Sequence, residues 1–205
     1  MKLNKMEFMA MNNPIRRFSQ KNIEFKRFKE YILKQKVTLL NSTILDAGCG
    51  SGFSSKLISN NFSPKELIAF DYMPEQIEIA KKKNPYAKYY IDDITNISQP
   101  TEKFDATFVF GILHHVPNWR QAIKELYRVI KTGGHLFICE VNDDGVRFVD
   151  RYLKFHHPQE SRFSWEQFSN VLTESNFIIE EQSKLIFSYF RSYMCKKNKD
   201  NILNI

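Results

Sequence analysis

The stretch ILDAGCGSGF, residues 44–53, decides how the rest of the chain is interpreted. Its apolar half is typical of a buried strand, and Gly48, Gly50 and Gly52 follow at every second position. A turn between a strand and a helix needs fewer glycines than this. Because glycine permits positive φ and leaves the backbone bare, the pattern favours a ligand that lies against peptide groups at the end of the strand.

Short apolar runs alternate with amphipathic segments after this stretch. The predicted strands are 43–47, 66–71, 87–91, 106–113 and 135–141, with helices predicted at 54–62, 74–83 and 119–130 and a turn at 131–134. Such alternation is typical of a parallel sheet with helices on both faces. The sequence therefore predicts a doubly wound α/β fold.

The pattern changes after residue 140. We expect a helix at 143–157 and another at 164–175, where Ser164 and Gln167 have the spacing of a capping box. The segments 177–185 and 188–196 are predicted to be strands that are close enough in sequence to pair antiparallel.

The charge of the chain is concentrated at one end. Residues 1–36 carry the whole net charge of +7, because they contain ten Lys and Arg but only three Asp and Glu. Its 205 residues suit one domain. We divide the chain into a basic N-terminal arm and helix at 1–36, with the helix at about 21–36, a main domain at 37–197 and a polar tail at 198–205.

Cysteine usage and hydropathy indicate a cytoplasmic protein. Cys49, Cys139 and Cys195 are odd in number and too widely spaced for a metal motif, so we expect neither a disulfide framework nor a metal site. No run approaches the roughly 20 apolar residues that span a bilayer, and the start lacks a signal-peptide pattern. We therefore expect no integral membrane association.

Asp71 narrows the choice of ligand. It ends the second predicted strand, 19 residues after Gly52, where α/β folds of this kind hold a ribose with a carboxylate. A dinucleotide oxidoreductase would share this arrangement, but its GxGxxG pattern needs glycine at position 53, which is Phe53. The sequence disfavours that class.

Five motifs carry a family resemblance. LDAGCGSG, AFDYMPEQIEIAKKK, YYIDDIT, FDATFVFGILHHV and ELYRVIKTGGHLFICE occur in this order within residues 44–140. The chain resembles the class I S-adenosylmethionine-dependent methyltransferases, in particular the small-molecule branch of ubiquinone and menaquinone biosynthesis. The resemblance implies a Rossmann-like, mostly parallel sheet of seven strands with the last antiparallel, an N-terminal helical lid, and S-adenosyl-L-methionine as cofactor.

The resemblance also implies a set of cofactor-binding residues. They lie at the ends of the predicted strands. At the amino-acid end of the cofactor we expect Asp46, Gly48, Cys49 and Gly50, with Phe110 and Gly111 beside the sulfonium. Asp71 would bind the ribose, Tyr72 and Met73 would flank the adenine face, and Asp93 and the Ile94 N–H would bind the adenine edge. Asp92 stands where many relatives carry glycine, so it remains an alternative to Asp93.

His115 is the predicted catalytic residue, as a base or an orienting group, with His114 and the more distant His156 and His157 as alternatives. Aromatic residues after the fifth strand favour a small, apolar or planar acceptor: Phe148, Tyr152, Phe155, Phe163 and Trp165. Arg16 and Arg17 offer guanidinium groups for a carboxylate of cofactor or substrate.

Two other functions stay open. The basic residues Lys21, Lys26, Arg27 and Lys29 suit RNA or a membrane-associated lipid or quinone. Nucleic acid is not favoured, because VFGIL replaces the Asn/Asp-Pro-Pro-Tyr/Phe signature of methyltransferases that act on base nitrogens. A noncatalytic module that binds the cofactor would share the same motifs. The sequence leaves open the oligomeric state and whether oxygen, nitrogen or carbon is methylated.

Overall fold

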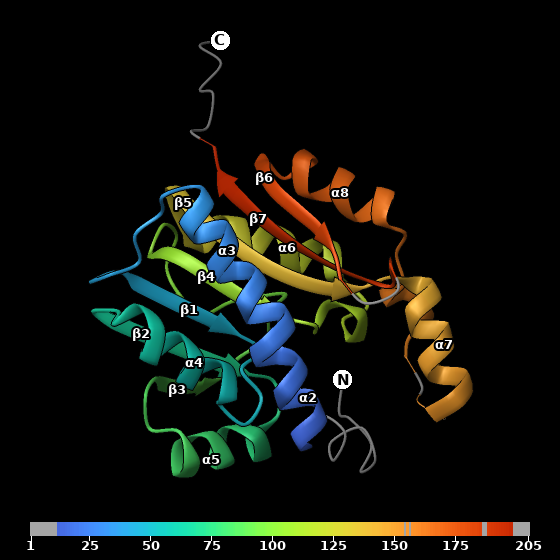
Figure 1. Ribbon diagram of the computed structural model, residues 1–205, viewed down its shortest axis with the longest axis horizontal. Helices are drawn as coiled ribbons and strands as arrows, with labels where there is room; N and C mark the ends of the chain where they lie inside the picture. The colour runs from blue at the N-terminus through green and yellow to red at the C-terminus, as the bar shows by residue number, and fades with distance from the viewer. Residues whose placement is uncertain (1–11, 154, 156, 186–187, 199–205) are drawn as a thin grey trace.

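A seven-stranded sheet forms the centre of the structure, a computed structural model that describes residues 12–153, 155, 157–185 and 188–198 (Figure 1). The strands are β1 (Thr43–Ala47), β2 (Glu66–Asp71), β3 (Lys88–Ile91), β4 (Phe104–Phe110), β5 (Ile130–Val141), β6 (Phe177–Lys184) and β7 (Phe190–Lys197). Their order is β3-β2-β1-β4-β5-β7-β6. Only β7 runs antiparallel to its neighbours, β5 and β6. The predicted doubly wound fold with an antiparallel last strand is confirmed.

Helices cover both faces of the sheet, as the apolar strands require. They are α2 (Pro14–Ser19), η1 (Gln20–Phe25), α3 (Lys26–Lys34), α4 (Phe53–Phe62), α5 (Pro74–Lys83), η2 (Leu113–His115), α6 (Trp119–Val129), α7 (Asp143–Leu153), η3 (Gln159–Ser161) and α8 (Trp165–Glu174). α3, α4 and α5 pack on one face, and α6 and α8 on the other (Figure 1). The predicted capping box of Ser164 and Gln167 begins α8.

The N-terminal helix starts at Pro14 rather than near residue 21. Oδ1 of Asn13 accepts a hydrogen bond from the Arg16 N–H (2.7 Å), and proline at the first helical position needs no donor there. The segment continues through η1, a π-helical turn, into α3. The predicted start was late because the apolar periodicity begins only at Ile23.

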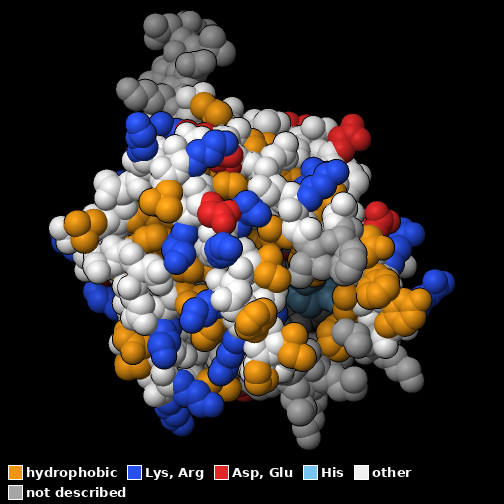
Figure 2. All heavy atoms as spheres, in the orientation of Figure 1, with side chains coloured by type: hydrophobic (Ala, Val, Ile, Leu, Met, Phe, Trp, Pro, Cys, Tyr) orange, Lys and Arg blue, Asp and Glu red, His pale blue; other side chains and the backbone are white. Residues whose placement is uncertain are grey.

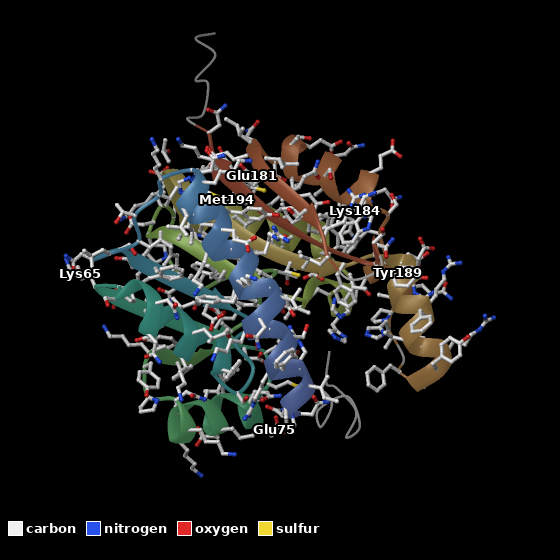
Figure 3. The ribbon with its side chains drawn as sticks, viewed as in Figure 1. Lys65, Glu75, Glu181, Lys184, Tyr189 and Met194 are labelled. Atoms are coloured by element: carbon white, nitrogen blue, oxygen red, sulfur yellow. The ribbon has the colours of Figure 1, made fainter. Side chains whose placement is uncertain are left out.

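This helix contributes to the core. Phe28 is fully buried, and its ring centroid lies 5.9, 5.3 and 5.8 Å from those of Phe108, Phe110 and Phe137. Met194 of β7 lies behind α3 and belongs to the same apolar cluster (Figure 3). The segment therefore folds against the sheet.

The predicted turn at 131–134 lies inside β5. Phe104 pairs with Ile130, whereas Ala106 pairs with His135, so the four residues between form a bulge in the strand. The expectation of a turn was wrong because glycine suits a bulge as well as a turn.

None of the helices in the described part of the chain has the length and apolar character needed to span a bilayer.

Candidate active site

A cavity of about 280 Å³, the first cavity, opens where β1, β2 and β4 end. Its lining includes six of the residues predicted to bind the cofactor, namely Gly48, Asp71, Tyr72, Met73, Asp93 and Ile94. Asp92, Ile112 and His115 also line it. The carboxyl ends of parallel strands thus bring together residues that are up to 67 positions apart in the chain.

A narrow recess of about 30 Å³ continues from Gly48, which lines both spaces. Three more predicted residues line the recess, Cys49, Gly50 and Phe110, together with Arg16 and Arg17 of the N-terminal helix. The recess therefore joins the glycine loop to the helix that covers it.

Gly50 and Gly52 are required for different reasons. Both have positive φ, +52° and +81°. A Cβ atom on Gly52 would lie 2.8 Å from the hydroxyl of Tyr89 and 3.0 Å from Cβ of Ala80. The space beside Gly52 is therefore already occupied by packed side chains. A Cβ atom on Gly50 would meet nothing within 4 Å. Among these two glycines, only Gly50 faces space that a ligand could occupy.

Asp71 ties the glycine loop to the second strand. Its Oδ2 accepts from the Gly50 N–H and its Oδ1 from the Met73 N–H, both at 2.9 Å. Burial raises the pKa of the Asp71 carboxyl. Each carboxylate oxygen has a second acceptor position, so the group can still bind hydroxyls in the first cavity.

Asp92 and Asp93 differ in how fully their carboxylates are used. In Asp92, Oδ1 accepts from the Asp93 N–H and Oδ2 from the backbone and hydroxyl of Ser98. In Asp93, Oδ1 accepts from the N–H and hydroxyl of Thr95, while Oδ2 has no partner in the described part of the chain. The geometry favours Asp93 over Asp92 as the adenine ligand, because one of its carboxylate oxygens is still able to accept a hydrogen bond.

The Asp46 side chain lies behind the glycine loop and lines neither the first cavity nor the recess. Its Oδ2 accepts from the hydroxyls of Ser54 and Ser55, at 2.7 and 2.6 Å. Oδ1 is buried without a partner among the described residues. Complete burial raises the pKa of Asp46 to about 6. The side chain therefore anchors the first turn of α4, and any contact with a ligand would involve the backbone.

A second cavity, of about 250 Å³, lies on the other side of His115, which lines both cavities. Much of its lining is apolar: Cys139, Val141, Val146, Val149, Phe155 and Phe190. Arg16, Ser19 and Glu24 close it from the N-terminal helix. Figure 2 shows His side chains at the bottom of a hollow that has hydrophobic side chains on its rim.

Glu140 organises the loop that carries the histidines. Fully buried at the end of β5, it accepts from the N–H groups of Ile112 (2.8 Å) and Leu113 (2.7 Å) through Oε1. Nδ1 of His114 lies 2.9 Å from Oε2. Burial lowers the pKa of His114 to about 3 and raises that of Glu140 to about 7, so the pair is a hydrogen bond with a neutral imidazole rather than an ion pair.

Sequence reasoning missed the role of Glu140. Its signal was an acidic residue at the carboxyl end of an apolar strand, the same signal that marked Asp71.

His115 and His157 complete a cluster with His114. Burial and the neighbouring imidazoles lower the pKa of His115 well below its usual value. Its Nδ1 is buried without a partner among the described residues. Nδ1 of His157 lies 2.5 Å from Oδ1 of Asp150. His156, the fourth histidine considered from sequence, lies outside the described residues.

The two predicted arginines have different environments. Arg16 forms an ion pair with Glu24 (2.6 Å) and donates to the carbonyl of Phe110 (3.3 Å). The guanidinium of Arg17 lies 5.7 Å from the ring centroid of Phe53, and its Nε is buried with no partner in the described chain. Arg17 is therefore the better candidate for a ligand carboxylate at the recess.

Comparison with known proteins identifies the core of the fold. Residues 45–138 match the family described as a methyltransferase domain. This central part of the chain is therefore similar to methyltransferase domains. Curated relatives include the 2-methyl-6-phytyl-1,4-hydroquinone methyltransferase of Synechocystis (32% identical, over 53% of this chain and 35% of the relative). The ubiquinone biosynthesis O-methyltransferase of Coxiella burnetii is 28% identical, over 62% of this chain and 63% of the relative.

The chain spans 35–63% of the length of these and the other first-ranked curated relatives. Solved structures share the fold. A chain in the complex between the Haloferax volcanii Trm112 methyltransferase activator and a candidate methyltransferase matches with a TM-score of 0.75 and 12% identity, over 97% of this chain and 100% of that one. The geranyl diphosphate C-methyltransferase of Streptomyces coelicolor, solved with S-adenosyl-L-homocysteine, matches with a TM-score of 0.69 and 11% identity, over 84% and 76%.

S-adenosylmethionine, the cofactor of such methyltransferases, fits the residues that line the recess and the first cavity. Gly50 leaves open space against bare backbone, Asp71 and Asp93 offer carboxylate oxygens, and the Arg17 guanidinium has an unpartnered nitrogen. Gly50 and Arg17 line the recess, and Asp71 and Asp93 line the first cavity, so groups suited to an amino acid, a ribose and an adenine occur in the two connected spaces.

Proposed function

We propose that the protein transfers a methyl group from S-adenosylmethionine to a small apolar or aromatic acceptor. The observation that carries the proposal is the arrangement of two cavities on either side of His115. One is lined by the residues expected to bind the cofactor, and the other is mostly apolar. A donor and an acceptor bound in them would meet at this side chain.

The donor side relies on backbone groups and on carboxylates that accept hydrogen bonds, all held in fixed positions. In the proposal, Arg17 and the backbone at Gly48 and Gly50 hold the amino-acid end, Asp71 holds the ribose, and Asp93 with the Ile94 N–H holds the adenine. Tyr72 and Met73 flank the ring. Asp71 is preorganised for this task because two backbone N–H groups already fix its orientation.

The bound cofactor supplies an electrophilic methyl group on a sulfonium. The protein then has to align the acceptor and exclude water, and alignment of two reactants contributes about 7–11 kcal/mol in favourable cases. The apolar walls of the second cavity, with Arg16 and Glu24 closing it, serve both needs.

The chemistry of the acceptor follows from those walls. Val141, Val146 and Phe190 offer contact area and few hydrogen bonds, which suits a ring or an isoprenoid better than a sugar or a peptide. The named relatives that methylate a phytyl hydroquinone or act in ubiquinone biosynthesis support a quinol-like acceptor.

His115 is the residue we place between donor and acceptor. Its lowered pKa keeps the imidazole neutral at pH 7 but also makes it a weak proton acceptor. We therefore propose that it orients the acceptor rather than holds its proton.

The test combines binding with turnover. Calorimetry with S-adenosylhomocysteine measures the donor site, and labelled S-adenosylmethionine with a panel of hydroquinones and phenols measures transfer. Val149→Phe narrows the second cavity and should abolish transfer while leaving product affinity unchanged. Phe148→Trp, on the half-exposed side of α7, is the matched control and should change neither.

Three results would contradict the proposal. No affinity for S-adenosylhomocysteine would remove the donor site, and binding without transfer to any acceptor would favour a noncatalytic module. Loss of transfer in Lys21→Gln/Lys26→Gln, where both lysines are exposed on the N-terminal helix, would favour RNA or an anionic membrane as the partner.

A further inference from the structure

We propose that His114, His115 and His157 form a binding site for a divalent metal of the zinc class, with an open coordination position toward the second cavity. The metal site stands on the geometry of these three side chains. Its role with an acceptor rests on the proposed function.

The three imidazoles converge from two separate segments. His114 and His115 belong to η2, and His157 follows α7. One nitrogen of each ring lies within 4.8 Å of the others, and the ring centroids are 4.2–5.3 Å apart. Tetrahedral zinc with bonds of about 2.0–2.1 Å places its nitrogens about 3.3 Å apart, so the rings would close by up to about 1.5 Å on binding.

Two of the rings are already held as metal ligands usually are. Nδ1 of His114 lies 2.9 Å from Oε2 of Glu140, and Nδ1 of His157 lies 2.5 Å from Oδ1 of Asp150. A carboxylate on one ring nitrogen fixes the orientation of the imidazole and leaves Nε2 with its lone pair for a metal. Packing of the rings alone does not require a carboxylate beside Nδ1 of both neighbouring histidines.

His115 supplies the second, independent sign of a ligand. Its Nδ1 is buried and has no hydrogen-bond partner in the described part of the chain. A buried polar atom left in this state destabilises the fold, and a bound cation would satisfy it.

The charges around the cluster suit a cation. Glu140 and Asp150 lie behind the rings. The second oxygen of Asp150 also pairs with Arg162 (3.0 Å), and the positive charge of Arg16 in the same cavity is paired with Glu24 at 2.6 Å. Three imidazoles with no thiolate in the cluster favour Zn²⁺, with Co²⁺ as its spectroscopic substitute.

Three protein ligands leave a fourth position for another molecule, which is the pattern of catalytic zinc. Here that position would face the apolar second cavity. If the acceptor is a phenol or hydroquinone, its oxygen would bind there, and the metal would lower the pKa of the hydroxyl. This would supply the deprotonation for which His115 itself is poorly suited.

The experiment titrates Co²⁺ into tag-free protein that has been stripped with EDTA and desalted. We expect one Co²⁺ per chain, a visible d–d absorption band typical of four or five ligands, and displacement by Zn²⁺. His157→Gln and His115→Gln should each lower the affinity more than 100-fold. Asp150→Asn, which keeps all three imidazoles, should lower it about 10- to 100-fold.

His135→Gln is the matched control, because His135 lies on β5 beside Glu180 and outside the cluster. It should bind Co²⁺ like the unaltered chain. Absence of the band, or equal affinity in the His115, His157 and His135 variants, overturns the metal site. Circular dichroism and thermal unfolding of the same samples show that each variant is folded, and the affinity of the unaltered chain for S-adenosylhomocysteine tests the proposed function separately.

Discussion

At the scale of single residues, Asp71 has two tasks that one substitution would confound. Its carboxylate fixes the backbone of the glycine loop and faces the first cavity. Asp71→Ala should weaken binding of S-adenosylhomocysteine by about 1–3 kcal/mol, the range for removing a partner from buried polar groups. Isothermal calorimetry measures the affinity, and thermal unfolding without ligand reports the loss of loop anchoring. Unchanged affinity would count against the ribose assignment.

Asp92 and Asp93 form a natural matched pair on the rim of the same cavity. Because Oδ2 of Asp93 is unpartnered among the described residues, Asp93→Asn should weaken binding of the adenosine product, by about 1 kcal/mol or more. Asp92→Asn should affect affinity less, since both oxygens of Asp92 are used within the turn. Calorimetry on the two variants decides between them, and the reverse order would assign the adenine to Asp92.

Asp46 should make stability depend on pH. Its folded pKa of about 6 exceeds the ordinary value of 3.8, so the stability present when the group is protonated is lost as pH rises through about 4 to 6. The difference corresponds to about 3 kcal/mol. Asp46→Asn removes this titration, so the unaltered chain should lose about 2 kcal/mol relative to the variant between pH 4 and pH 7. Urea unfolding at both pH values measures it, and parallel curves would contradict it.

At the scale of elements, the glycine loop separates packing from ligand access. Gly52→Ala should destabilise the fold by left-handed strain of about 1–2 kcal/mol and by crowding of about 1–3 kcal/mol against Tyr89 and Ala80. Gly50→Ala carries only the strain, but its methyl group would project into open space at the recess. We expect it to lose more product affinity than stability. Thermal unfolding and calorimetry on both variants test this, and similar profiles would contradict it.

Most elements were predictable because their signals are local. Alternating apolar runs, the capping residues of α8 and the strand-end glycines each lie within a few residues of the feature they cause. Two predictions were wrong: the late start of the N-terminal helix and the turn at 131–134. Both depend on residue types that occur in two kinds of local structure. Asn13 and Pro14 begin a helix as readily as a loop, and glycine forms a bulge as readily as a turn.

At the scale of the whole molecule, the N-terminal helix should be indispensable. Phe28→Ala should lower the free energy of unfolding by about 3–5 kcal/mol, since the ring is fully buried against three others. Leu33→Ala on the same helix, with its side chain 77% exposed, should change it by less than about 0.5 kcal/mol. Chemical denaturation compares the two, and equal effects would show that the helix is a separate appendage.

The candidate site was predictable only in part, because half of it is assembled by tertiary contacts. Gly48, Asp71 and Asp93 follow strands whose carboxyl ends meet in any fold of this type. The approach of His157 to His115 depends on how the segment after α7 folds back, and no spacing in the sequence encodes that. Tyr189, beside the start of α7 (Figure 3), shows the same dependence, since its Cβ lies close to Gly145.

The surface on which the N-terminal helix packs has a consequence for folding during biosynthesis. Its Tyr31 hydroxyl lies 2.8 Å from the hydroxyl of Ser192 on β7, so residues near the start of the chain pack against residues near its end. During translation the helix leaves the ribosome before every strand of the sheet, yet β7, which is part of its docking surface, emerges after the other six strands. Until then its aromatic face is open to chaperones or to misassociation. Nascent chains halted before β7 should therefore remain protease-sensitive at their amino end, even where the central strands have already formed.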